Sequence, residues 1–515
     1  MSIVGDAPFG VQIFEDDTTT DAIDRVRGAG ATWARTRALW KLVEPQPGQY
    51  DWTVTDALFG DATAAGLRNL AAVYANPPWA ADTECGPPSA AGRARWAALW
   101  TALVERYDGD GMGDAPSGGV VRWWQVGNEV DFDPAAAGAE GDYGSCLGGQ
   151  PEVYAALLLE ARAAAKAADP EVMIGFGPVA WDRFTAESAP DGWTAPPGPY
   201  AYDFTERALE ALARLAIDQG RQESAAAALE PPPAAPLVDF VALHHYNDNA
   251  HAWDGPAGRE LVARVARFRD AQLALPGTYD VRGLPLVISE IGLAAGPSDD
   301  YTERSEAHQA AYAGQAMVRA RAAGAAFTIW YTARDNLFGD CLPPHWDWLA
   351  FGLMRSDDRQ DALAARCPGA ADWDDAGWLA AYALDDGPAT PRPALAALAT
   401  AAELLRDRAF DGSIQSPAVE ALPAAASIEA YRFRSADGRL LVAAWATTGA
   451  RIGARTIPPP NATWTVDATV LDDWTGQVTV TDHLGGRAVT GSPGQPSVTI
   501  ALGEAPVYLQ ATDDG

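Results

Sequence analysis

The sequence contains no run of apolar residues long enough to cross a bilayer, which takes about 20 in succession. Basic residues are also few: 37 Lys and Arg stand against 69 Asp and Glu, which gives the 515-residue chain a net charge of −32. Nucleic acids and anionic membranes are bound through basic patches. We therefore expect neither a membrane nor a nucleic acid as a partner of this chain.

Cysteine and histidine are scarce, with 4 and 6 copies. The cysteines lack the Cys-x-x-Cys spacing of a structural zinc site, and the few histidines do not favour a zinc hydrolase. The Gly-x-Ser-x-Gly turn of a serine hydrolase is also missing. We accordingly predict an activity that uses neither a metal nor a cofactor.

The cysteines lie in stretches rich in Gly, Pro and Asp, which are typical of loops. Their even number allows two disulfides, which would require an oxidising compartment. We expect Cys85 to pair with Cys146, because they fall in neighbouring loops, and Cys341 with Cys367, because they share one loop. Four unpaired thiols are the alternative.

The first residues, MSIVGDAPFG, lack the basic and apolar parts of a signal peptide. This leaves two alternatives, an intracellular protein or one whose signal has been removed. The paired loop cysteines favour a secreted or periplasmic protein, and a cytoplasmic one stays open.

The composition is that of a globular protein, with 48% hydrophobic and 21% charged residues. Short apolar runs alternate with Ala-rich helical stretches, which indicates βα units and a parallel sheet. The predicted strands are Phe9–Ile13, Thr32–Arg35, Arg68–Tyr74, Val121–Val126, Val172–Phe176, Phe240–His244, Leu286–Ser289 and Ala326–Trp330. Eight parallel strands are the number that closes a (β/α)₈ TIM barrel.

Helices are expected between these strands, because apolar positions recur there every three or four residues. The predicted helices include Asp21–Ala29, Gly92–Tyr107, Val153–Ala168, Tyr202–Asp218, Arg259–Ala274, Ser305–Ala323 and Pro393–Arg406. The proline-rich segment Gln222–Pro236 is expected to follow a helix as a spacer. Beyond Arg408 short alternating strands predominate, so we assign residues 1–408 to the barrel and 409–515 to a β-sandwich.

Two of the strand-like runs end in a glutamate. VVRWWQVGNEV, Val120 to Val130, carries Glu129 near its end, and LPLVISEIG, Leu284 to Gly292, carries Glu290. Side chains at the carboxyl ends of barrel strands line the mouth where active sites form. Two carboxylates that face each other there can cleave a glycosidic bond.

These segments resemble those of retaining glycoside hydrolases of clan A, most closely family thirty-nine, whose catalytic glutamates end strands four and seven. The likeness spans nearly the whole chain. It implies that Glu129 is the general acid/base and Glu290 the nucleophile, and that a carbohydrate is the substrate. One departure is Val130, which stands where many relatives have proline.

The resemblance also implies supporting residues. Asn128 completes the Asn-Glu pair and would contact a sugar hydroxyl. Arg35, after strand two, and Tyr246, from the His-x-Tyr that includes His244, would favour the charged form of the nucleophile. Trp330 would stack on a sugar ring.

The segment YANPPWA, Tyr74 to Ala80, resembles the stretch after strand three in these enzymes. Asn76 is a candidate hydroxyl ligand, although asparagine also suits turns, and Trp79 is a second candidate for stacking. Rival carboxylates are Glu44, Glu84, Asp131, Asp133, Glu303 and Asp335.

We expect a retaining, exo-acting enzyme similar to a β-xylosidase or β-glucosidase, because long mouth loops favour a pocket. An endo-acting glycanase, a transglycosylase and a non-catalytic carbohydrate-binding barrel are the alternatives. Retention predicts that the two carboxyl groups lie about 5–5.5 Å apart.

Overall fold

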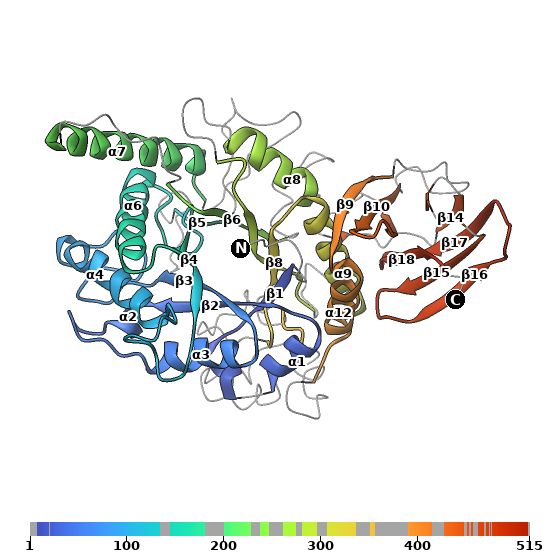
Figure 1. Cartoon of the computed structure of the whole chain (residues 1–515), viewed down its shortest axis with the longest axis horizontal. Coiled ribbons are helices and arrows are strands. Elements are labelled where there is room, and N and C mark those ends of the chain that lie inside the picture. Colours follow the sequence, from blue (N-terminus) through green and yellow to red (C-terminus); the bar gives the residue numbers. More distant parts are fainter. Residues whose placement is uncertain are drawn as a thin grey trace.

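The structure is a computed structural model of the whole chain, shown in Figure 1. It describes residues 8–19, 21–133, 145–180, 200–227, 237–246, 261–273, 281–295, 306–335, 351–355, 390–414, 427–447, 451–452, 455–456, 462–467, 470–472, 474 and 476–512.

Eight strands form a closed barrel, so the predicted fold class is confirmed. Each strand pairs in parallel with the next, and β1 pairs with β8 to close the ring. The strands are β1 (Phe9–Gln12), β2 (Trp33–Leu39), β3 (Arg68–Tyr74), β4 (Val121–Val126), β5 (Met173–Val179), β6 (Phe240–Tyr246), β7 (Leu286–Gly292) and β8 (Phe327–Trp330).

An apolar layer fills the barrel below its mouth. Its members come only from strands and include Trp33, Trp123, Phe240 and Phe327. The rings of Trp33 and Phe327, on β2 and β8, stack 3.9 Å apart, so the layer spans the barrel. Because side chains alternate along each strand, inward positions nearer the carboxyl ends lie above this layer and form the mouth.

Helices surround the barrel, as Figure 1 shows. They are α1 (Ala22–Gly28), α2 (Trp40–Val43), α3 (Thr53–Ala64), α4 (Ala90–Tyr107), α6 (Pro151–Ala168), α7 (Phe204–Ala227), α8 (Leu261–Arg267), α9 (Glu306–Ala322) and α12 (Pro393–Leu405). A π-helical turn, Phe268–Gln272, continues α8.

One helix end differs from the prediction. α7 continues to Ala227, so the first part of the expected spacer Gln222–Pro236 is helical. The run of alanine and polar residues after Asp218 has good helix propensity, and the proline breakers come only at Pro231. The rest of that segment lies outside the described residues.

The C-terminal part contains antiparallel sheets that share a core of their own. The strands are β9 (Arg408–Ser413), β10 (Ser427–Ser435), β11 (Leu440–Thr447), β12 (Arg451–Ile452), β13 (Arg455–Thr456), β14 (Ala462–Asp467), β15 (Gln477–Asp482), β16 (Arg487–Gly491), β17 (Ser497–Leu502) and β18 (Val507–Ala511). β14 and β17 pair beside the six-stranded sheet, which agrees with the predicted β-sandwich. The assigned boundary at residues 408 and 409 falls at the start of β9, and the division into two domains stays a prediction.

The helix α9 joins the two parts. Its Arg319 donates to the carboxylate of Glu429 on β10, and the guanidinium lies 5.0 Å from the ring centre of Trp445 on β11. Gln315 donates to the backbone oxygen of Glu504. The β domain therefore packs beside the barrel on α9 and α12, as Figure 1 shows.

Candidate active site

The turn after β4 carries Glu129. The strand ends at Val126, and Gly127 then has φ +94°. A Cβ on Gly127 would lie 2.6 Å from Val130 and 2.9 Å from the Ser145 hydroxyl, so this tight turn requires glycine. Glu129 itself has φ +45°, which few residues other than glycine adopt. The turn therefore gives Glu129 an unfavourable backbone conformation, which contacts with the surrounding residues must stabilise.

Glu290 lies within β7 and points into the mouth, 8% exposed. One of its carboxylate oxygens accepts a short hydrogen bond from Arg35 on β2. The other oxygen accepts from the hydroxyl of Tyr246 at the end of β6. Each of these two donors presents a hydrogen to an oxygen of Glu290. Together they provide the surroundings that a carboxylate anion requires.

His244 connects the two glutamates. Its Nδ1 lies 3.0 Å from Glu129 Oε1 and 3.4 Å from Glu290 Oε2. One oxygen of each carboxylate and this ring nitrogen all lie within 4.8 Å of one another. The tertiary fold thus brings together three residues that the sequence predicted separately.

Burial shifts the pKa values of Glu129 and His244 in opposite directions. It raises the pKa of Glu129 to about 7, and the Arg35 charge opposes this rise only in part. It also lowers the pKa of His244 to about 3, so the imidazole is neutral at neutral pH. Glu129 still exposes 17% of its side chain, so it can both hold a proton and reach a bound molecule.

Arg35 organises the site beneath the glutamates. Its guanidinium, 3% exposed, donates to Gln125 Oε1 at 2.9 Å, Gln12 Oε1 at 2.8 Å and Asn128 Oδ1 at 2.6 Å. Gln12 and Gln125 were not among the predicted site residues. Gln12 ends the apolar run of β1, and Gln125 follows the two tryptophans of β4; a buried amide beside such residues is the signal that could have revealed them.

Trp330 does not occupy the mouth, so the prediction that it stacks on sugar is wrong. Its side chain is fully buried against Tyr312 of α9, and its indole nitrogen donates to the Phe351 backbone oxygen at 3.0 Å. Phe327 and Ile329 face inward on β8, so alternation directs Trp330 outward.

The next residue, Tyr331, faces the mouth instead. Its ring packs with Phe14 and Phe351 and makes an edge-on contact with Tyr246, 6.2 Å between centres. Burial first, and then the charge of Glu290, raises the pKa of Tyr331 far above its ordinary value. The aromatic residue beside the glutamates at the end of β8 is therefore Tyr331.

Asn76 supports a loop, so the prediction that it binds a sugar hydroxyl is not supported by its contacts. Its side-chain nitrogen donates to the backbone oxygens of Gly86 at 3.1 Å and Thr83 at 3.4 Å. Trp79 donates to the Glu44 backbone oxygen and packs edge-on against Trp40. A sugar contact by Trp79 stays a prediction.

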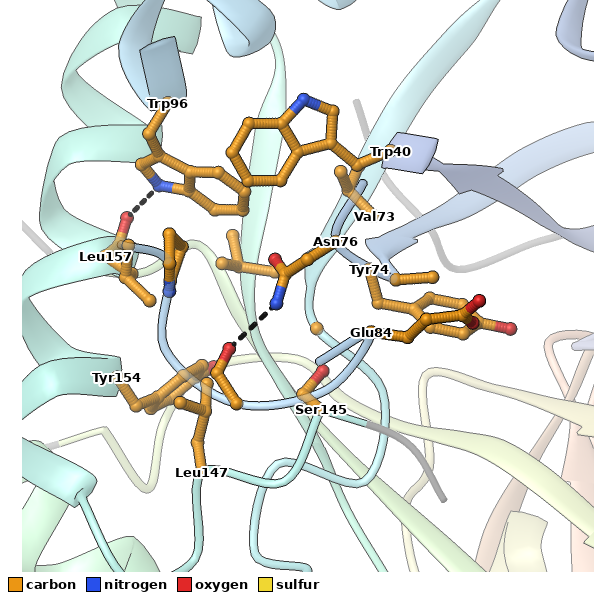
Figure 2. A pocket seen from close by; sticks show the side chains of 15 residues that line it. Trp40, Val73, Tyr74, Asn76, Glu84, Trp96, Ser145, Leu147, Tyr154 and Leu157 are labelled. Atoms are coloured by element: carbon orange, nitrogen blue, oxygen red, sulfur yellow. Dashed lines mark hydrogen bonds between the residues drawn. The ribbon is translucent and has the colours of Figure 1, made fainter. Parts of the chain in front are cut away.

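A cavity lies beside this loop and not between the glutamates. Figure 2 shows Asn76 within it, with Trp40 and Trp96 on one side and Tyr154 and Ser145 on the other. Val73 and Val126, which face outward from β3 and β4, also line it. The cavity therefore lies between the barrel wall and the helices.

The rival carboxylates have structural partners. Glu44 is fully buried and accepts from Trp40, Gly48 and Arg95. Glu84 pairs with Lys41, Asp131 accepts from the backbone nitrogen of Ala180, and Asp335 forms a bidentate pair with Arg392. The carboxylate of Asp133 lies next to Gly149. Glu303 lies outside the described residues.

Among the residues that the structure describes, two groups of side chains have the donor types of a metal site. One is Glu129, His244 and Glu290, and the other is Asp108, Asp110 and Asp114 in the loop after α4. In the first group Arg35 already supplies a positive charge to Glu290. That guanidinium would repel a metal ion bound at the same carboxylate, and the expectation of a metal-free site stays a prediction.

The structure joins Cys85 and Cys146 in a disulfide, which is one of the two predicted pairs. It bridges the loops after β3 and β4. Cys341 and Cys367 lie outside the described residues. Within the described part of the chain, none of the helices is long and apolar enough to span a membrane.

Comparison of the structure with solved structures finds the same architecture in glycoside hydrolases. A family 39 glycoside hydrolase from Bacteroides cellulosilyticus WH2 has a TM-score of 0.58 at 17% identity, covering 99% of this chain and 82% of that one. The chain therefore shares its overall fold with this glycoside hydrolase.

Two further structures share this fold. A glucosidase from Croceicoccus marinus has a TM-score of 0.56 at 15% identity, covering 99% of this chain and 97% of that one. The family 30 subfamily 8 xylanase Xyn30A from Clostridium acetobutylicum has a TM-score of 0.51 at 12% identity, with coverage of 99% and 98%. Family models and curated proteins give no match to the sequence. Identities this low establish the fold alone.

Proposed function

We propose that the chain is a retaining glycoside hydrolase in which Glu290 is the nucleophile and Glu129 the general acid/base. The observation that carries this proposal is that both carboxylates converge on one nitrogen of His244 at the barrel mouth, which lies 3.0 Å from Glu129 Oε1 and 3.4 Å from Glu290 Oε2. Retaining enzymes hold their carboxyl groups about 5–5.5 Å apart, whereas inverting enzymes leave about 6.5–9.5 Å for a water molecule.

The surroundings of each glutamate suit the proposed roles. Burial keeps a proton on Glu129 up to about pH 7, so it can protonate the departing glycosidic oxygen. Glu290 receives hydrogen bonds from Arg35 and Tyr246, which orient its oxygens for attack on the anomeric carbon. The C–O bond to the leaving group breaks as the glycosyl–Glu290 ester forms. Glu129, now ionised, then removes a proton from the water that hydrolyses this ester.

Neutral His244 orients Glu129 in both steps. With its hydrogen on Nδ1, the neutral imidazole donates to Glu129 Oε1, 3.0 Å away, whether Glu129 is protonated or ionised, and this leaves Oε2 to carry the proton that passes to the leaving oxygen. A charged histidine would instead favour the ionised form and weaken the acid. The low pKa of His244 prevents this.

We propose that the substrate is a β-xyloside or β-glucoside and that the enzyme removes the sugar at the end of the saccharide. The long loops that follow the strands in the sequence favour a pocket over an open cleft. The partner is then a carbohydrate, and the Cys85–Cys146 disulfide favours an oxidising location, secreted or periplasmic. Endo-action and transfer to a second sugar are alternatives that product analysis distinguishes.

The first experiment is a panel of para-nitrophenyl glycosides, followed by NMR of the first product anomer. Retention of configuration is expected, and an inverted product would exclude double displacement. Xylo- and gluco-oligosaccharides then identify the mode of cleavage. Monosaccharide as the sole early product supports exo-action, mixed oligomers indicate endo-action, and longer products indicate transfer.

Site variants test the two roles. Glu290→Gln should lose activity on every substrate by at least about a thousandfold, whereas Glu129→Gln should retain most of its kcat/KM on dinitrophenyl glycosides, which leave without protonation. Azide should restore Glu129→Ala and yield a glycosyl azide of retained configuration. Glu105→Gln, an exposed site on α4, is the matched control and should behave as the parent protein. Equal losses for both variants across all leaving groups would contradict the assignment.

A further inference from the structure

Three backbone nitrogens of the turn that carries Glu129 donate hydrogen bonds. Gly127 and Glu129 both have positive φ, a region that disfavours residues other than glycine. The backbone nitrogens of Gly127 and Val130 donate to Val73 and Pro178 at 2.9 and 3.1 Å. Between them, the nitrogen of Asn128 donates to a side chain, the hydroxyl of Ser145, at 2.9 Å.

Ser145 is fixed from outside the turn. Its backbone oxygen accepts from Gly86 at 2.8 Å, and its neighbour Cys146 is bonded to Cys85. Both contacts come from the loop after β3. The two cysteines are 61 residues apart along the chain. Ser145 is 8% exposed, so its hydroxyl lies in the interior, where the bond to Asn128 is protected from water.

A cavity borders the turn on its outer side. The cavity shown in Figure 2 is lined by Gly127 of the turn and by Ser145 and Leu147 of the loop that follows. Its wall is largely apolar, with Trp40, Trp96 and Tyr154 at its sides. Ser145 lines this cavity beside Gly127 and accepts from the nitrogen of Asn128, so on this side the anchoring of Ser145 helps to hold the turn.

We propose that Ser145, anchored by the Cys85–Cys146 disulfide, is a positioning residue for the general acid/base. This inference rests on the proposed function. Ser145 holds the nitrogen of Asn128, whose Oδ1 accepts from Arg35 at 2.6 Å, and so keeps the next residue, Glu129, beside His244. The disulfide links this arrangement to the neighbouring loop. Reduction of the disulfide therefore loosens the general acid/base, Glu129, and not the nucleophile, Glu290.

The test compares leaving groups, because only poor ones need the acid. Ser145→Ala should reduce kcat/KM on phenyl β-xyloside and phenyl β-glucoside about tenfold, and kcat/KM on the dinitrophenyl glycosides by less than about twofold. Ser89→Ala is the matched control, since the Ser89 hydroxyl accepts from Gly92 to cap α4 in the same region. It should change kcat/KM on both substrates equally or not at all.

Removal of the disulfide tests the anchor. The double variant Cys85→Ser/Cys146→Ser should show the same leaving-group dependence as Ser145→Ala. Combining it with Ser145→Ala should add less than about twofold, because both changes release the same contact. Full additivity of the two effects, or a loss that is equal for phenyl and dinitrophenyl substrates, would overturn the proposed link.

A third measurement does not depend on turnover. Carbon NMR of labelled glutamate side chains reports the pKa of Glu129, identified as the signal missing from Glu129→Gln. In Ser145→Ala this pKa should fall from about 7 toward 4.5, because the released turn admits water. An unchanged pKa together with unchanged leaving-group dependence would refute the role of Ser145. If Glu129→Gln itself shows no leaving-group dependence, the proposed function fails instead, and the NMR result still decides whether Ser145 positions the turn.

Discussion

Glu129→Gln should make the folded protein more stable at neutral pH while removing its ability to protonate a leaving group. Burial raises the pKa of Glu129 from an ordinary value of 4.5 to about 7 in the folded state. Between these two values the folded chain binds this proton more tightly than the unfolded chain. Stability therefore falls as pH rises through this range, and the full cost is present above about pH 7.

The size of this cost follows from the two pKa values. One pKa unit corresponds to about 1.4 kcal/mol, so a rise from 4.5 to about 7 amounts to about 3 kcal/mol of lost stability. Glutamine is neutral at every pH and keeps an oxygen and a donor for His244. The variant should therefore equal the parent protein near pH 4.5 and exceed it by up to about 3 kcal/mol above pH 7.

Urea unfolding of both proteins at several pH values between 4.5 and 8 measures this difference. The comparison is made at each pH, because the many other carboxylates titrate equally in both proteins and cancel. Glu105→Gln on α4 is the control, since its exposed side chain should change the free energy of unfolding by less than about 0.5 kcal/mol at every pH. A gain that does not depend on pH, or a loss above pH 7, would refute the raised pKa of Glu129.

Three other outcomes are expected. Trp330→Ala should lower the free energy of unfolding by about 3–5 kcal/mol and leave kcat of the folded fraction unchanged; a stable variant with low kcat, measured by urea unfolding and kinetics, would return Trp330 to the site. Tyr246→Phe should reduce kcat/KM about tenfold to a hundredfold by removing a donor to Glu290, with little change in Tm; normal kinetics would exclude this role. Dialysis against EDTA should leave activity unchanged because Arg35 already supplies the charge at Glu290; a loss that a divalent ion restores would point to a metal in the site.

The barrel could be predicted because the pattern that specifies it is local. Parallel strands buried on both faces are continuous apolar runs, and the predicted bounds of Arg68–Tyr74 and Val121–Val126 are those of β3 and β4. The pattern is weaker in the C-terminal strands β9 and β16. Their largely exposed or half-buried residues, RAFDGS and RAVTG, give no such apolar run.

The same local pattern located Glu129 and Glu290, because a carboxylate where an apolar strand ends is unusual. It did not reveal the direction of a side chain near a strand end. Trp330 and Tyr331 are adjacent aromatic residues, and a shift in register between β7 and β8 precedes them. Which one faces the mouth depends on how β8 pairs with its neighbours.

Sequence alone thus determined the order of strands, the barrel and the two glutamates, because each depends on residues close together in the chain. The closed barrel determined which side chains surround these glutamates. Arg35 and Glu290 are 255 positions apart, yet the guanidinium joins Glu290 to Gln125, Gln12 and Asn128. Such contacts, and the burial that raises the pKa of Glu129, arise only when distant strands converge and exclude water.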